Sequence, residues 1–279
     1  MELSSNVFWH QTDFNGLKGI IRDKGLFYSY SREDYRSYFG RHMGFPMISL
    51  CDLPLSQFDE YIDKYGGYCI GLSHEWGVEN GFNPVWYNFM STEGALFEIL
   101  KNKTINVVVG YYYLLSSIKP YEGTLYRKEK QYENYRFYDE REIRRVPSLE
   151  NMNAQNLNPI LIGEEYDDFK AERKSHGKKP YLEELGKIDI GYKDIKFLIV
   201  KEEYQIEKFY QAINSSYSKE VEDNANSKRK HYIPILTYKQ IKEDIIGCAH
   251  NVLADLVMDA VLGRNFEGQL FAISNSMKK

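Results

Sequence analysis

The sequence predicts an α+β fold, because runs of strand-like segments are separated by helical ones. Several short apolar runs, rich in β-branched residues, are typical of strands buried inside a sheet. These runs are residues 46–51, 68–72 and 195–200. Two longer stretches, 15–25 and 202–213, carry apolar residues at the spacing of an amphipathic helix. The 279 residues contain neither an internal repeat nor a clear linker, so we expect a single domain over residues 1–279.

The N-terminal part of the chain is expected to form a strand, a helix and a loop, in that order. Residues 5–12 read as the strand, and Asp13 or Asn15 can cap the helix by accepting a backbone N–H. Gly25 is expected to end the helix. The apolar stripe of the helix consists of Leu17, Ile20 and Ile21. Residues 28–42 are polar and rich in tyrosine, which favours a loop.

The rest of the chain alternates between helical and strand-like segments, with two exceptions. Helices are predicted within residues 55–62, from His74 to Gly81, around residues 96–100 and 107–118, and over 237–262, and strands over 84–88, 131–147 and 233–236. The first exception is an irregular, polar helical and loop insertion at about residues 148–190, which lacks a core pattern. The second is a mobile loop at about residues 215–230, which are almost entirely polar.

Composition argues against several functional classes. The formal net charge of −4 disfavours a broad nucleic-acid-binding surface, which needs clustered Lys and Arg, although a local basic groove stays possible. The three cysteines, Cys51, Cys69 and Cys248, form no paired framework, so we expect a reduced, cytoplasmic setting. No stretch approaches the roughly 20 apolar residues of a membrane span, and no membrane contact is expected.

The motifs of common nucleotide-binding, hydrolytic and metal-dependent enzymes are missing from the sequence. It has no standard phosphate-binding glycine loop, no Gly-x-Ser-x-Gly elbow and no His-Glu-x-x-His. Its six histidines offer no pair suited to a metal, so no metal site is predicted. His10 stands apart, because it lies at the end of the first strand and shares a face with Thr12. An imidazole and a hydroxyl placed in this way can hydrogen-bond a ribose or a phosphate.

Two glutamates, Glu140 and Glu142, form the pattern that most suggests chemistry. Residues two apart in a strand point to the same face, so these carboxylates would lie side by side. Two acids at this distance repel, and one of them is expected to hold its proton more tightly than usual. The alternative is a solvated strand edge, on which the glutamates simply alternate with Arg141, Arg144 and Arg145.

An ordered set of motifs resembles the AbiGi family of abortive phage-infection proteins. These motifs are residues 46–56, 65–77, 83–85, 138–142 and 194–200. Shorter pieces also resemble, more distantly, the DarT-like branch of the ADP-ribosyltransferases. These pieces are residues 10–12, 15–25, 83–87 and 140–144. One position departs from the AbiGi pattern, since Ile143 stands where a tryptophan is usual, and this change would alter a pocket wall.

The resemblance implies an ADP-ribosyltransferase-like mixed sheet with surrounding helices, and NAD as the substrate. Glu142 would stabilise the cationic ribose that forms when nicotinamide leaves, and Glu140 would orient or deprotonate the acceptor. His10 and Thr12 would hold a ribose. The remaining implied contacts are stacking on nicotinamide by Tyr28, Tyr30 or Tyr87, and pairing with the pyrophosphate by Arg32, Arg41 or Arg144.

Two functional hypotheses follow from the resemblance. The first is an NAD-dependent ADP-ribosyltransferase, or an NAD glycohydrolase, that acts in phage defence on a nucleic-acid, protein or nucleotide acceptor. The second is a non-catalytic antitoxin or sensor on the same fold, which binds a cognate toxin or a phage component. The family name favours the second, because it denotes the antitoxin half of a two-component abortive system.

Overall fold

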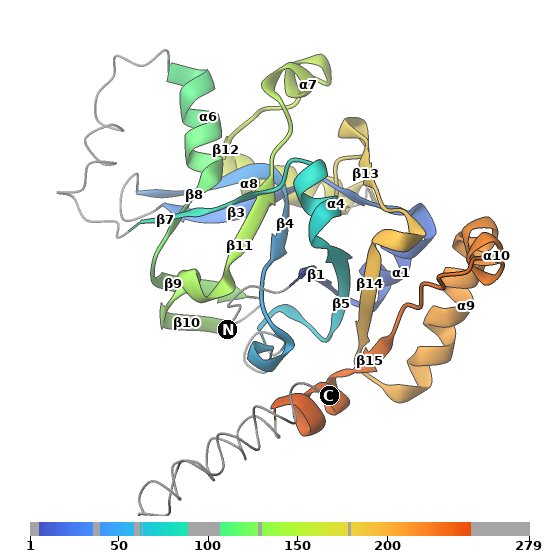
Figure 1. Ribbon diagram of the computed structural model, residues 1–279. Coiled ribbons are helices and arrows are strands. Elements are labelled where there is room, and N and C mark those ends of the chain that lie inside the picture. Colours follow the sequence, from blue (N-terminus) through green and yellow to red (C-terminus); the bar gives the residue numbers. More distant parts are fainter. Residues whose placement is uncertain are drawn as a thin grey trace, which may run out of the picture.

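The computed structural model describes residues 6–35, 40–58, 62, 64–88, 107–127, 130–177 and 180–246 (Figure 1). The helical stretch predicted around residues 96–100 lies outside these ranges, as does the part of the predicted C-terminal helix beyond residue 246. Within the described ranges, no helix is both long and apolar enough to cross a membrane.

A nine-stranded sheet forms the centre of the molecule. The sheet is mixed, because β14 and β15 are parallel whereas β1 pairs antiparallel with both of its neighbours. The predicted α+β class is therefore confirmed. The strand order is β15 (Ile235–Thr237), β14 (Ile195–Val200), β5 (Tyr68–Ser73), β1 (Val7–Thr12), β4 (Arg41–Cys51), β11 (Glu142–Arg145) and β6 (Asn83–Pro84), with β3 (Ser29–Tyr35) and β12 (Leu161–Ile162) also on β4.

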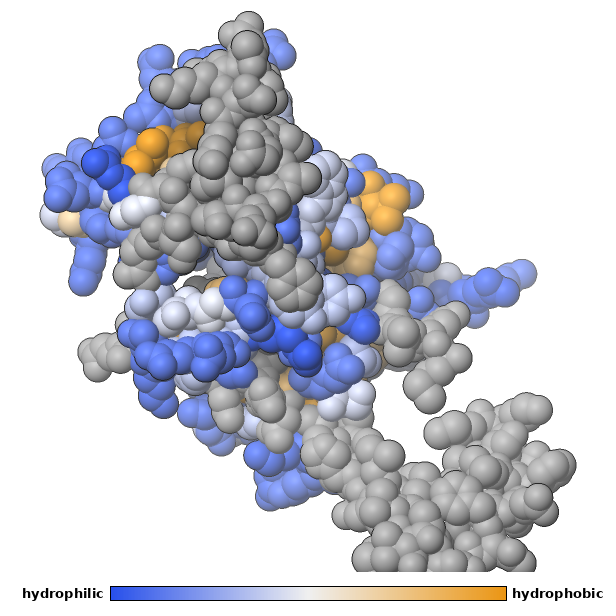
Figure 2. Space-filling model, turned by 90° about the vertical axis from the view of Figure 1, so that its left-hand side faces the viewer, coloured by the Kyte–Doolittle hydropathy of each residue, from blue (hydrophilic) through white to orange (hydrophobic). Residues whose placement is uncertain are grey.

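Short strand pairs and helices surround this sheet (Figure 1). The pairs are β2 (Gly25–Phe27) with β13 (Lys187–Asp189), β7 (Trp86–Asn88) with β8 (Ile118–Pro120), and β9 (Gly123–Arg127) with β10 (Lys130–Tyr135). The described helices are α1 (Phe14–Asp23), α4 (His74–Glu79), α6 (Val107–Ser117), α7 (Leu149–Ala154), α8 (Glu164–Ser175), α9 (Ile206–Ser216), α10 (Ser218–Ala225) and α11 (Tyr238–Gln240). On the face that carries β7 and β8, hydrophilic residues dominate the described surface, and hydrophobic ones form small separate patches (Figure 2).

Helix α1 forms as the sequence predicts, apart from its last residue. The Asp13 carboxylate caps it by accepting the Gly16 N–H at 2.7 Å, and Leu17 and Ile21 are fully buried against the sheet. The helix ends at Lys24, whose φ of 49° lies in the left-handed region, rather than at Gly25. Gly25 instead begins β2, where a Cβ would come within 2.7 Å of a carbonyl oxygen of β13.

Strand β4 has different neighbours along its length, and this creates a gap in the sheet. One edge pairs with β11 over residues 48–51 and with β12 at residues 43–44. The other edge pairs with β3 over residues 41–47, and then with β1 at a single position, where Cys51 faces Trp9. Residues 48–50 on this second edge therefore lie between β3 and β1. We call this gap the fork.

Two polar segments are more ordered than the sequence predicts. Residues 28–42 were expected to be a loop, but most of them form β3 and the start of β4. Strand β3 buries Glu33 together with Tyr30 and Tyr35, so polarity in this segment does not mean exposure. The mobile loop predicted at residues 215–230 is also wrong over α10, which follows the buried ring of Tyr217.

Residues 148–190, for which the sequence predicts an irregular insertion without a core pattern, pack against the sheet. They supply α7, β12, α8 and β13. The Phe169 ring of α8 contacts the Tyr30 ring of β3 edge-on, at a centroid distance of 4.8 Å. The Tyr30 hydroxyl donates to the Asn158 carbonyl oxygen. These contacts fix α8 beside the fork.

Candidate functional site

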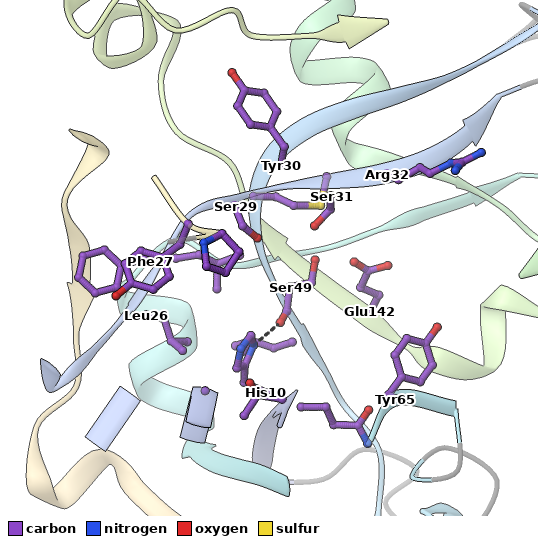
Figure 3. Close-up of a pocket in the computed structure, with 18 of the residues that line it drawn as sticks. His10, Leu26, Phe27, Ser29, Tyr30, Ser31, Arg32, Ser49, Tyr65 and Glu142 are labelled. Carbon is purple, nitrogen blue, oxygen red and sulfur yellow. Dashed lines mark hydrogen bonds between the residues drawn. The ribbon is translucent and has the colours of Figure 1, made fainter. Parts of the chain in front are cut away.

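A pocket of about 860 Å³ occupies the fork (Figure 3). Residues 9–12 of β1, 29–34 of β3 and 47–50 of β4 line it, together with parts of α1, α8 and the turn before β11. Because successive strand residues point to alternate faces, this lining includes residues from both faces of the sheet. Figure 3 shows His10, Ser49, Tyr65 and Glu142 around one space within it.

His10 reaches across the fork from β1 to β4. Its Nδ1 atom lies 3.0 Å from the Ser49 carbonyl oxygen. A carbonyl oxygen only accepts, so Nδ1 carries the hydrogen and Nε2 is left as an acceptor without a hydrogen bond to any described residue. Burial lowers the pKa of His10, although the bond to Ser49 opposes this shift, and the neutral ring is favoured.

Thr12 lies beside the first turn of α1. A Cβ at position 16 would come within 1.9 Å of its hydroxyl oxygen, so only glycine fits at Gly16. Both His10 and Thr12 line the pocket, as their shared face in the strand predicts.

Glu142 is held by two cations. The Arg144 guanidinium donates from Nε to one carboxylate oxygen at 2.7 Å and from Nη2 to the other at 2.9 Å. The Lys119 ammonium lies 2.7 Å from the second oxygen. Burial raises the pKa of Glu142, but Arg144 and Lys119 outweigh burial, so its pKa lies well below the ordinary value. Glu142 therefore stays ionised at neutral pH.

Glu140 lies beside Glu142, but the predicted geometry is wrong. The predicted strand 131–147 is interrupted by a 3-10 turn, Phe137–Glu140, and Arg141 adopts a left-handed φ of 44° before β11 begins. The two carboxylates meet because both bind Lys119, whose Nζ lies 2.6 Å from Glu140. The Tyr65 hydroxyl donates to the other Glu140 oxygen.

A third carboxylate, Glu33 of β3, completes the group. It accepts a hydrogen bond from the Arg144 guanidinium. Glu33, Glu140, Glu142, Lys119 and Arg144 are each at most 7% exposed, and we call these five residues the charge cluster. Burial raises the pKa of Glu33 more than Arg144 and Lys119 lower it. The tightly held proton that the sequence predicts for Glu140 or Glu142 is thus expected at Glu33, because Glu142 shifts in the opposite direction.

The solvated strand edge that the sequence left open is ruled out by this burial. Glu140 is 2% exposed, Glu142 7% and Arg144 4%. Ile143 points away from the charge cluster and is buried in the hydrophobic core, where it pairs with Leu50. Ile143 does not line the pocket, so the prediction that isoleucine in place of the usual tryptophan alters a pocket wall is wrong.

Five of the eight predicted site residues line the pocket: Glu142, Glu140, His10, Thr12 and Tyr30. The other three, Tyr28, Tyr87 and Arg144, do not. Tyr28 and Tyr87 are engaged elsewhere, since the Tyr28 hydroxyl accepts from Arg145 Nε at 2.8 Å and the Tyr87 hydroxyl accepts the Glu142 N–H at 2.7 Å. The Arg144 guanidinium is turned to Glu142, to Glu33 and, through Nη1, to the Ser116 carbonyl oxygen. It is therefore not available to a pyrophosphate.

Sequence reasoning missed Lys119, Glu33 and Tyr65. Lys119 lies in the short strand β8, between apolar Ile118 and Pro120, and such a placement was the available sign of a buried cation. Glu33 lies in the segment that was expected to be a loop. Within the described ranges, no group of three or more His, Cys, Asp or Glu residues is arranged to hold a metal ion.

The comparisons with known proteins agree with one another. A family model described as "Putative abortive phage resistance protein AbiGi, antitoxin" matches residues 25–201. The abortive phage resistance protein AbiGi of Lactococcus lactis subsp. cremoris is 27% identical over 225 residues, which cover 71% of this chain and 88% of that protein. No solved structure gives a significant match. Because the family match spans more than half of the sequence, this chain belongs to the AbiGi family of abortive phage resistance proteins.

Proposed function

We propose that this chain acts in abortive phage resistance as an NAD-using enzyme with an ADP-ribosyltransferase-like fold. The observation that carries the proposal is the position of His10 and Glu142. They come from β1 and β11, 132 residues apart in the sequence, yet both line the pocket at the fork. A large pocket with convergent polar groups and a strongly shifted carboxyl pKa is the usual setting of a catalytic site.

The proposed reaction breaks the bond between nicotinamide and the ribose of NAD. The bonding electron pair leaves with nicotinamide, and the ribose carbon becomes cationic until an acceptor oxygen or nitrogen attacks it and loses its proton. An ionised carboxylate facing this carbon stabilises the transition state electrostatically. Glu142 has the required charge, because Arg144 and Lys119 hold its pKa low. Glu140 binds Lys119 with one oxygen and Tyr65 with the other, and so helps to position Lys119 against Glu142.

His10 supplies the second contact in the proposal. Its bond to Ser49 fixes the ring, and Nε2 is left to accept a hydrogen bond from a ribose hydroxyl. We place the Thr12 hydroxyl next to it on the same ribose. Tyr65 lines the pocket near these groups, in place of Tyr28 and Tyr87. The Tyr30 ring points away from them (Figure 3) and packs on Phe169 of α8.

His10→Ala is expected to lower NAD consumption by about 100-fold, because the ribose loses its positioning contact. The measurement is the loss of NAD, followed by chromatography, when the purified protein is mixed with extract from phage-infected cells as a source of acceptor. His176→Ala is the matched control, since His176 is exposed at the end of α8 and does not line the pocket. Equal NAD consumption by the two variants would contradict the role of His10. A wild-type protein that consumes no NAD would contradict the proposed enzymatic function.

A second candidate function is a non-catalytic antitoxin, and the description of the matching family favours it. In this case the fold binds and neutralises a partner toxin. A toxin encoded beside this chain is then expected to co-purify with it, and the complex should survive Glu142→Gln because no chemistry is needed. The measurement is the dissociation constant of each variant for the purified toxin. This candidate fails if the neighbouring protein does not bind.

A further inference from the structure

Part of the pocket wall comes from the segment after β11, which the sequence presents as a polar insertion. Tyr166 and Lys170 of α8 line the pocket, as do Pro180 and Tyr181 beyond the helix. The Tyr181 ring stacks on Phe27 at a centroid distance of 4.5 Å and an angle of 18°. This segment therefore belongs to the site.

Two cations of the pocket wall, Lys170 and Arg32, belong to elements that meet at the Tyr166 ring. The ring lies on Gly44 of β4, where a Cβ would come within 2.2 Å of it. Arg32 of β3 is the direct strand partner of Gly44, so its side chain leaves the sheet on the same face as the ring. The Lys170 ammonium lies 5.5 Å from the ring centroid, one helical turn further along α8. Arg32 and Lys170 both line the pocket.

Neither cation is neutralised by a carboxylate of the described residues. Lys170 is half-buried, and its contacts are the Tyr166 ring and the like charge of Arg173. The acid three residues before it on the helix, Asp167, lies 3.2 Å from the His42 Nε2 atom. Arg32 contacts the Tyr126 ring at 5.8 Å. Lys170 is therefore a partly desolvated positive charge that an anion would stabilise, whereas Arg32 is exposed.

We propose that Lys170 and Arg32 bind a phosphate group of a nucleotide ligand, beside the Tyr166 ring. This inference deepens the proposed function and rests on it for the identity of the ligand. It also replaces an expectation from the sequence. Of the three arginines expected at a pyrophosphate, Arg144 is enclosed in the charge cluster and Arg41 does not line the pocket, so only Arg32 stays available.

The test is titration calorimetry of the full chain with inorganic pyrophosphate and with ADP-ribose. Lys170→Met is expected to weaken the binding of both by about 10-fold or more, because a charge-assisted contact to phosphate is lost. Lys170→Arg should keep most of the affinity. Lys174→Met is the matched control, since Lys174 lies on the same helix but is exposed and outside the pocket lining. An unchanged melting temperature checks that Lys170→Met folds.

Equal affinities of Lys170→Met and the wild type overturn the inference, and so does a wild type that binds neither probe. A parallel NAD assay separates this result from the proposed function. If NAD is consumed and Lys170→Met leaves the KM for NAD unchanged, the proposed phosphate site is rejected and the proposed NAD-using function is kept. If pyrophosphate binding depends on Lys170 but no NAD is consumed, the proposed phosphate site is kept and the proposed NAD-using function is rejected.

Discussion

Replacing Arg144 by methionine is expected to lower the free energy of unfolding by about 3–5 kcal/mol, because it leaves buried charges without a partner. In the native protein Arg144 binds both oxygens of Glu142 and one oxygen of Glu33, and its own exposure is 4%. Without it, Lys119 is the one cation among the three carboxylates of the charge cluster. The loss is measured by urea unfolding at pH 8.

The effect of Arg144→Met should become smaller as the pH falls. Without Arg144, burial and mutual repulsion would raise the pKa values of Glu33 and Glu142 in the folded state. A carboxyl whose pKa is raised by folding destabilises the protein above that pKa, and the destabilisation is lost as the pH drops through it. The difference between variant and wild type should therefore be clearly smaller at pH 5 than at pH 8.

Arg145→Met is the matched control for this prediction. Arg145 is the next residue of the same strand, but it donates to the Tyr28 hydroxyl and the Asn80 carbonyl oxygen and makes no ion pair among the described residues. Removing it costs hydrogen bonds from a cation to two neutral acceptors, about 1.5–3 kcal/mol, with little dependence on pH. If the two variants lose the same stability at both pH values, the charge cluster is not the source of the effect.

Local features of this fold could be predicted from the sequence, because they depend on neighbouring residues. The Asp13 cap and the buried side of α1 follow from a spacing of three and four residues. The buried strands β4, β5 and β14 follow from short apolar runs. In both cases the pattern and the structure that it forms lie within the same few residues.

The charge cluster could not be predicted in this way, because its partners are far apart in the sequence. Glu33 is paired in its buried position by Arg144, 111 residues later, and the polar segment around Glu33 gives no sign of that partner. The sequence predicts that Glu140 and Glu142 lie side by side because they are two residues apart in one strand. That strand is interrupted, and the two carboxylates meet because both bind Lys119. That His10 and Glu142 line one pocket depends in turn on the fork, which exists because β3 and β1 share one edge of β4.

Glu142→Gln is expected to lower NAD consumption by about 100-fold or more while leaving the affinity for ADP-ribose nearly unchanged. The amide keeps the shape of the side chain but loses the negative charge that the cationic ribose requires. Glu33→Gln is the matched control, because it also replaces one carboxyl group of the charge cluster with an amide. Burial raises the pKa of Glu33, so the amide resembles the protonated form of this side chain, and unfolding measurements can verify that both variants fold. Glu33 binds Arg144 rather than the proposed ribose carbon, so Glu33→Gln should lose less than about 10-fold. Similar losses in the two variants would mean that the loss of any one carboxyl group from the charge cluster lowers activity, and that the position of Glu142 does not matter.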